Sequence, residues 1–306
     1  MDTVVTNVFL PIALAIVMFG LGLSLSVADF VKVSRKPKAI LITLFCQLVL
    51  LPAVCFGLIV FLHLSPLLAV GMMLLAATPG GTTANLFSHL FYGDVALNIT
   101  VTVINSVIAL ITFPLIVRFA IDHFNPSIGG KDVVLPLIRV AEVFAIVLVP
   151  VAVGMLVRAS APYFAHRMDR PVRILSAVVL ASVVLGAIVV ERSNFFDYIS
   201  RVGLISVVFC MISLAAGFYI PRALGVETGQ AIASAMEIGV HNSTLAITIA
   251  ISVLDSVTMA IPAAVYSIVM FPVAAIVGAM ISRSHIAKVG GGSHKKASGN
   301  RKSHSH

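Results

Sequence analysis

The sequence predicts an all-α polytopic membrane protein with nine transmembrane helices. Three observations predict this class. Hydrophobic residues make up 59% of the 306 residues and charged residues only 10%, whereas a soluble domain carries about 25% charged residues. The hydrophobic residues gather in runs close to the roughly 20 residues that cross a bilayer. Two of these runs also carry similar polar motifs at their centres, which indicates an internal repeat.

Charged and turn residues separate the apolar runs into nine expected spans. The first begins almost at Met1 and lacks the basic region and the cleavage site of a signal peptide, so we interpret it as a retained helix. The expected spans are 6–27, 38–63, 66–92, 95–119, 133–157, 174–190, 202–221, 227–254 and 256–282. Pro52, Pro150 and Pro262 lie inside spans, where we expect packing kinks.

The lysine and arginine residues predict the orientation of these spans. The segments that follow odd-numbered spans, including the C-terminal tail, contain 15 of them, whereas the segments on the opposite side contain 5. Because basic loops stay in the cytoplasm, we expect the N-terminus outside and the C-terminus in the cytoplasm. The expected location is the inner (plasma) membrane of the cell.

The charge and cysteine patterns exclude several classes of protein. The formal net charge is +8, but the basic residues lie at span ends, so no basic face for nucleic acid is expected. Cys46, Cys55 and Cys210 lie in apolar runs without the spacing of a disulfide framework or a zinc site. Because the sequence has no HExxH motif and no phosphate-binding glycine loop, we predict that the protein is not an enzyme.

Residues 286–306 are expected to form a disordered, basic cytoplasmic tail or an appended remnant that is not native. Ala297 is the only apolar residue after Val289, so this segment cannot pack against a core. A histidine-rich metal-binding tract and a contact with anionic lipid are the alternatives.

The third and eighth spans carry polar, helix-breaking motifs at their centres. Span 66–92 contains PGGTTAN (79–85), and span 227–254 contains EIGVHNS (237–243). Each is followed by an acidic residue that opens a helix ending in Phe-Pro. Such motifs at the midplane of two corresponding spans indicate a transporter binding site. Because the two spans enter the membrane from opposite sides, we expect two inverted five-helix repeats, the first of which lacks its first helix.

Glu237 is the only carboxylate expected deep in the bilayer. The other acidic residues lie at span ends or in loops, except Glu142, which follows Arg139 by three residues and is expected to form an ion pair with it. An ionised carboxylate in hydrocarbon is costly and usually functional. Since its own span contains no basic residue, Glu237 needs either a proton or a bound cation.

Uncharged oxygen donors are expected at the depth of Glu237. Asn98, Thr102 and Asn105 are spaced i, i+4, i+7 and share one helix face. The polar residues that fall in the same, cytoplasmic half of the bilayer are Gln47, Asn85, Asn98, Thr102 and Glu237. Hard oxygen donors with a single carboxylate suit a monovalent cation such as Na⁺. The alternative is that each polar group bonds to a neighbouring helix.

His241 and the residues at the interruptions have two interpretations each. His241 is either a neutral side chain bonded within the interrupted helix, or a second cation ligand or proton-coupled group. Thr82 and Asn242 flank the interruptions, where the N-terminus of a half-helix favours an anion. We therefore expect a substrate site at Thr82, Thr83, Asn242 and Ser243, with simple helix capping as the alternative.

The paired motifs resemble the signature motifs of the bile acid:sodium symporter family. Pro79-Gly80-Gly81-Thr82 with Asn85 resembles one motif and Glu237-x-Gly-x-His-Asn242 the other, and the likeness extends over about residues 8–282. It implies a bacterial member of this family, with a core domain containing two crossed broken helices and a panel domain. The implied parts are 1–63 (panel helix and first core helix), 64–125 (core helices of the first repeat), 126–200 (panel helices of the second repeat), 201–285 (core helices of the second repeat) and the tail 286–306.

The resemblance also implies two sodium sites and an organic anion bound in a cavity that faces the panel. The ligands implied for the first sodium are Asn85, Asn98, Thr102 and Glu237. Those implied for the second are Gln47, Glu237, His241 and the carbonyls of Ile238 and Val240. Two positions depart from the family pattern, since many relatives have glutamine at His241 and serine at Ala84.

These observations predict a sodium-coupled secondary active symporter that imports a small organic anion by alternating access. The anion is bile-acid-like or another carboxylate such as pantoate, and the expected partners are sodium ions, this anion and the lipid bilayer, with the protein a monomer. A proton-coupled carrier or antiporter that uses Glu237 and His241 is one alternative. A membrane receptor that binds the ligand without moving it is the other.

Overall fold

The computed structural model describes residues 37–165 and 195–299, together with isolated helical positions between 12 and 23 and between 167 and 178. Five of its helices are long and apolar enough to cross a membrane: Pro37–Phe61, Val95–Phe124, Leu137–Ser160, Val202–Ala223 and Val257–Arg283. They confirm five of the predicted spans and the all-α membrane class. The predicted spans 6–27 and 174–190 lie largely outside the described residues.

Local sequence signals set several helix boundaries. Pro66 opens α6, as proline does in a first helical turn. The Asp94 side chain caps α8 by accepting the Leu97 N–H at 3.1 Å. The described elements are α4 (Pro37–Phe45), η2 (Cys46–Leu50), α5 (Leu51–Phe61), α6 (Pro66–Ala76), α7 (Thr82–Leu90), α8 (Val95–Phe124), β1 (Ser127–Ile128), β2 (Lys131–Asp132), α9 (Leu137–Ser160), α11 (Phe195–Ala223), α12 (Thr228–Gly239), α13 (Ser243–Ser252) and α14 (Val257–Gly299).

The third and eighth spans are interrupted where the motifs predict. α6 and α7 are separated by residues 77–81, and α12 and α13 by residues 240–242. The two unwound segments pair as a short antiparallel bridge centred on Gly80 and His241. The Gly81 N–H donates to the Val240 carbonyl at 2.8 Å and the Asn242 N–H to the Pro79 carbonyl at 3.0 Å. Each unwound segment thus satisfies backbone groups of the other, which water cannot reach in a bilayer.

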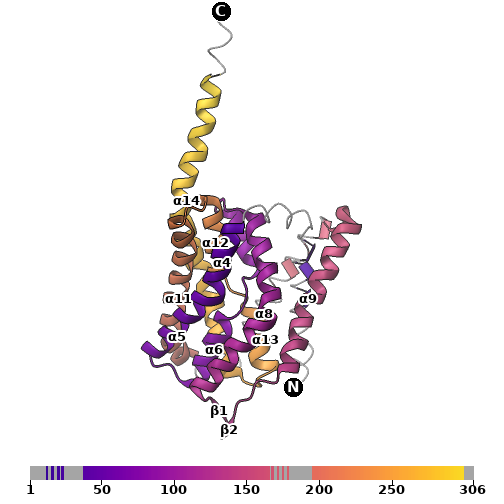
Figure 1. The fold of residues 1–306 in the computed structure, drawn as a ribbon, viewed down its shortest axis with the longest axis vertical. Coiled ribbons are helices and arrows are strands. Elements are labelled where there is room, and N and C mark those ends of the chain that lie inside the picture. The colour runs from indigo at the N-terminus through magenta and orange to yellow at the C-terminus, as the bar shows by residue number, and fades with distance from the viewer. Residues whose placement is uncertain are drawn as a thin grey trace, which may run out of the picture.

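Small residues allow the helices around the interruptions to approach closely. α12 packs against α11, α7 and α8, while α13 packs against α14 and α6. A Cβ at Gly71 of α6 would overlap the Met259 carbonyl of α14, and one at Gly217 of α11 would overlap Ala235 of α12. Among the labelled helices, α9 contacts α8 and α13, and it stands at the margin of the bundle (Figure 1). It also packs closely against Gly22, and Arg158 of α9 donates to the Leu23 carbonyl at 3.0 Å.

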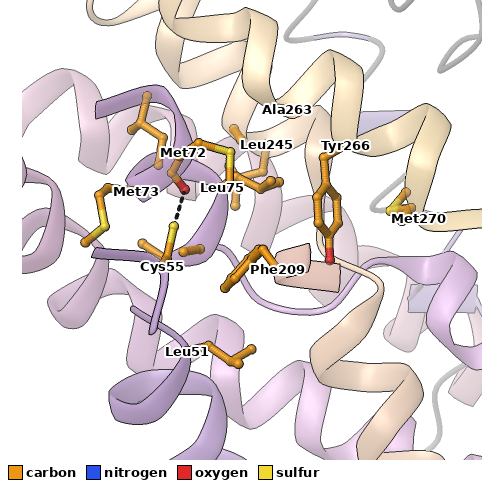
Figure 2. Packing of buried hydrophobic residues seen from close by; sticks show 14 of the residues in the cluster. Leu51, Cys55, Met72, Met73, Leu75, Phe209, Leu245, Ala263, Tyr266 and Met270 are labelled. Carbon is orange, nitrogen blue, oxygen red and sulfur yellow. Dashed lines mark hydrogen bonds between the residues drawn. The ribbon is translucent and has the colours of Figure 1, made fainter. Parts of the chain in front are cut away.

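A continuous apolar core joins the helices around the two interruptions, with residues from α5, α6, α11, α13 and α14 (Figure 2). In it, Phe209 of α11 and Tyr266 of α14 have ring centroids 6.0 Å apart. The Cys55 thiol donates to the Met72 carbonyl at 3.5 Å, so it behaves as a small buried group. This packing holds the helices that carry the two unwound segments.

Three features differ from the sequence prediction. β1 and β2 form a short antiparallel hairpin across Gly129 and Gly130, both at positive φ, which a tight hairpin turn favours. α14 is helical to Gly299 and projects beyond the bundle (Figure 1), whereas a disordered tail is predicted from residue 286. The predicted ion pair of Arg139 and Glu142 is absent from α9, where both side chains are exposed and pairing gains little.

Candidate cation site

Glu237 lies in the last turn of α12 and is fully buried. Its Oε2 accepts a 2.6 Å hydrogen bond from the Thr102 hydroxyl of α8, while its Oε1 has no hydrogen-bond partner. The segment between α6 and α7 passes directly over the carboxylate, since a Cβ built on Gly80 would overlap it. Burial of a charge requires a partner. Glu237 therefore lies with an unused oxygen at the meeting of the two interrupted helices.

Asn98 is oriented so that its oxygen remains free. Its amide nitrogen donates to Ser88 Oγ at 2.6 Å and to the Ala233 carbonyl at 3.0 Å, and its Oδ1 is buried without a partner. The Thr102 hydroxyl lies 3.0 Å from the main-chain carbonyl of Asn98, one turn earlier in α8, in addition to its contact with Glu237. The structure thus connects three of the four residues predicted for the first sodium.

Gln47 lies in a π-helical turn, η2, between α4 and α5. Its amide nitrogen donates to the Thr78 carbonyl at 2.8 Å and lies 3.4 Å from His241 Nδ1, while its Oε1 is buried without a partner. Pro52 accounts for the wide turn, because it has no N–H for the carbonyl four residues earlier and its ring would clash there in an α-helix. The turn at Pro52 is therefore more than a packing kink, since it presents Gln47 to the interruption.

His241 is held between aromatic rings and Gln47. It stacks on Phe209 with centroids 5.5 Å apart and an interplanar angle of 14°, and it lies in a T-shaped arrangement with Tyr266, whose ring centroid is 5.5 Å away. The Gln47 amide nitrogen lies 3.4 Å from His241 Nδ1, and the donor and acceptor roles in this contact depend on the tautomer of the ring. Nε2 is buried without a partner. His241 is thus ordered within the interruption and still has one unused polar atom.

Main-chain carbonyls at the end of α12 also lack the N–H donors that a continuous helix would supply. The Asn242 N–H donates to Pro79, so the Ile238 carbonyl loses the donor that a continuous helix would supply. The Val240 carbonyl accepts the Gly81 N–H and keeps a second lone pair. Both predicted carbonyl ligands therefore retain the capacity to accept.

The predicted substrate residues lie at the N-termini of α7 and α13. Asn242 Oδ1 caps α13 by accepting the Leu245 N–H at 3.1 Å, so the capping alternative holds for this oxygen. Ser243 Oγ is buried without a partner, and Thr83 is half-buried. Thr82 begins α7, but its side chain lies outside the described part of the structure.

Three residues of the site were missed by sequence reasoning. Gly80 makes room for the carboxylate, Ser88 orients Asn98, and Tyr266 donates to the Gly239 carbonyl at 2.8 Å. Gly80 belongs to the predicted break, which is a usable signal. A serine or tyrosine in an apolar span has no distinctive spacing, so the other two give none.

The arrangement is suited to a hard cation of low charge. Among the predicted sodium ligands, four side-chain oxygens from four separate elements have no partner, on Gln47, Asn85, Asn98 and Glu237. Within the described residues, no group of three or more His, Cys, Asp or Glu side chains could hold a metal. Amide and carbonyl oxygens with a single carboxylate are hard donors, whereas transition metals favour imidazole and thiolate ligands.

Comparison with known proteins also points to sodium-dependent transporters. The model of the Sodium Bile acid symporter family matches residues 11–198, more than half of the chain. The chain is 28% identical over 263 residues to the uncharacterized sodium-dependent transporter YocS of Bacillus subtilis, covering 85% of this chain and 78% of that protein. It is 27% identical over 248 residues to the ileal sodium/bile acid cotransporter of Oryctolagus cuniculus, covering 81% of this chain and 70% of that protein.

These relatives are transporters, which confirms the prediction that the chain is not an enzyme. Together with the apolar helices, they show a multi-pass membrane protein. The chain belongs to the sodium bile acid symporter family.

Proposed function

We propose that this chain is a sodium-coupled symporter that imports a small organic anion by alternating access. The observation that carries the proposal is the buried Glu237 carboxylate, whose Oε1 lacks a partner. Asn98 and Asn85 also have unpaired side-chain oxygens. A bound Na⁺ would neutralise the carboxylate and occupy these oxygens together. The names of the relatives support this, since they describe a sodium-dependent transporter and a sodium/bile acid cotransporter.

Two sodium positions are proposed on either side of Glu237. The first uses Asn85, Asn98, Thr102 and Glu237. The second uses Gln47, Glu237, His241 and the carbonyls of Ile238 and Val240. Because Glu237 belongs to both sets, a change of this residue affects both ions.

The anion is proposed to bind at the N-termini of α7 and α13, through Thr82, Thr83, Asn242 and Ser243. Helix N-termini carry partial positive charge and free N–H groups, both of which favour an anion. The same paired segments start these helices and supply sodium ligands, so ordering one site stabilises the other. This coupling must be reciprocal, and sodium and anion should each raise the affinity for the other. The anion is bile-acid-like or a smaller carboxylate such as pantoate.

Alternating access is proposed as movement of the core against a panel that includes α9. The core comprises the first core helix within 1–63 together with residues 64–125 and 201–285. The sparse packing of α9 against α8 and α13 supports this division. We place the N-terminus outside and the C-terminus in the cytoplasm of the inner membrane, as a monomer. The β1–β2 hairpin and the end of α14 lie at opposite ends of the bundle, as this topology requires (Figure 1).

The test is uptake of taurocholate and of pantoate by the purified full chain in proteoliposomes. A sodium gradient should drive accumulation of at least one anion, and a potassium gradient should not. Uptake driven by a pH gradient and indifferent to sodium would support the proton-coupled alternative. Sodium-dependent thermal stabilisation by the anion without accumulation would support a receptor.

A further inference from the structure

One buried side chain beside the paired segments is used by neither proposed sodium site. Asn105 of α8 is 1% exposed, and neither its amide nitrogen nor its oxygen has a hydrogen-bond partner. Among the described residues it is the only side chain with two such atoms. Leaving a buried amide unpaired is costly, so a water molecule or a bound ligand has to supply its partners.

The contacts between α8 and α12 fix the level of Asn105. The helices run parallel in a constant register, and the contacts that define it are Asp94 N–H to the Gly229 carbonyl at 2.8 Å, the Asn98 amide to the Ala233 carbonyl at 3.0 Å, and the Thr102 hydroxyl to Glu237 at 2.6 Å. Continued by three residues, this register places Asn105 level with Val240. α12 has ended there and the pairing with the α6–α7 segment begins.

The free atoms of Asn105 differ from those of the proposed sodium ligands. Asn98 uses its amide hydrogens on Ser88 and Ala233 and leaves only an oxygen, which suits a cation. Asn105 keeps both its NH₂ group and its oxygen free. A cation would occupy the oxygen and leave the NH₂ group unpaired. A ligand with an acceptor and a donor on neighbouring atoms occupies both.

We propose that Asn105 binds the head group of the transported anion, and that this head group carries a hydroxyl beside its carboxylate. The Asn105 NH₂ donates to a carboxylate oxygen, and its Oδ1 accepts from the hydroxyl. This inference rests on the proposed function and adds a specificity-determining residue to it. It also restricts the substrate to anions with a donor next to the charged group.

The experiment compares Asn105→Leu with Ser106→Ala in the purified full chain. Ser106 is a buried neighbour whose hydroxyl already bonds the Thr102 carbonyl at 2.7 Å, so its removal should leave anion binding unchanged. The probes are 2-hydroxy-3-methylbutanoate and 3-methylbutanoate, which differ only in the hydroxyl, measured by thermal shift in sodium and in potassium. The wild type should bind the hydroxylated anion about tenfold more tightly, the value of one or two neutral hydrogen bonds.

Asn105→Leu should abolish this preference while the sodium concentration of half-maximal effect stays that of the wild type. Its Tm without anion should equal or exceed the wild-type value, because leucine needs no partner. A lower Tm would assign Asn105 a structural bond and overturn the proposal. An equal response of the wild type to both anions, including no response, overturns it too. A preference for the hydroxylated anion without any sodium dependence would contradict the proposed sodium coupling and leave the role of Asn105 unchanged.

Discussion

The Thr102 hydroxyl of α8 and the Glu237 carboxylate of α12 are joined by a 2.6 Å hydrogen bond in the last turn of α12. The bond uses Oε2 and leaves Oε1 without a partner. It connects a continuous helix to an interrupted one. A cation at Oε1 would therefore be held by both, so that its binding is linked to the order of the unwound segments.

Glu237→Gln keeps the shape of the side chain and removes its charge. We expect sodium-dependent uptake to fall by about 100-fold or more, because the cation loses its only carboxylate. The sodium-free protein should stay folded, since a neutral amide is less costly to bury than an unpaired carboxylate. Uptake and the thermal shift between sodium and potassium measure these effects. Glu142→Gln, on an exposed position of α9, is the control and should behave as the wild type; sodium-dependent uptake by both variants would contradict the assignment.

Gly80→Ala tests the close approach of the α6–α7 segment to the Glu237 carboxylate. The new methyl group would overlap the carboxyl group, so we expect a loss of about 1–3 kcal/mol of stability and a weaker response to sodium. Gly57→Ala in α5 is a matched control, because a Cβ there has nothing within 4 Å. It should stabilise the helix by about 0.5–1 kcal/mol. Equal denaturation midpoints for the two variants would show that the segment can move away at no cost.

Pro52→Ala tests whether the π turn positions Gln47. Alanine can donate to the carbonyl four residues earlier, so the turn can close and rotate Gln47 away from Thr78 and His241. We expect the Hill coefficient for sodium to fall from about 2 towards 1 while the first ion still binds. Pro150→Ala, in α9, should leave the sodium curve unchanged. An unaltered Hill coefficient in Pro52→Ala would mean that the packing around Gln47 suffices.

Asn242→Ser separates capping from substrate binding. Serine caps a helix about as well as asparagine. The free energy of unfolding should therefore change by less than about 0.5 kcal/mol, and Tm should stay close to the wild-type value. The amide nitrogen is lost, however, and we expect the KM for the anion to rise about tenfold at saturating sodium. Asp94→Ser makes the same kind of cap exchange at α8, away from the substrate site, and should change neither quantity. An unchanged KM in Asn242→Ser would leave Asn242 a capping residue only.

The amino-acid sequence determined the membrane class and the place of both interruptions. These properties follow from composition and from local helix-breaking residues, which act in any tertiary context. Glu237 could be singled out as the deep carboxylate for the same reason, because its depth follows from the length of its own span. The ion pair of Arg139 and Glu142 could not be judged this way, since an exposed pair depends on solvation rather than on spacing.

Only the tertiary structure decided which atoms are used and which remain free. The bonds from Thr102 to Glu237 and from Asn98 to Ala233 join residues 135 positions apart, and no local pattern predicts such a register. The π turn that presents Gln47, the space that Gly80 leaves for a carboxylate and the two unpaired atoms of Asn105 depend equally on neighbouring helices. Helix formation and membrane insertion are governed by short stretches of chain, whereas hydrogen-bond partners are set by the packing of distant ones.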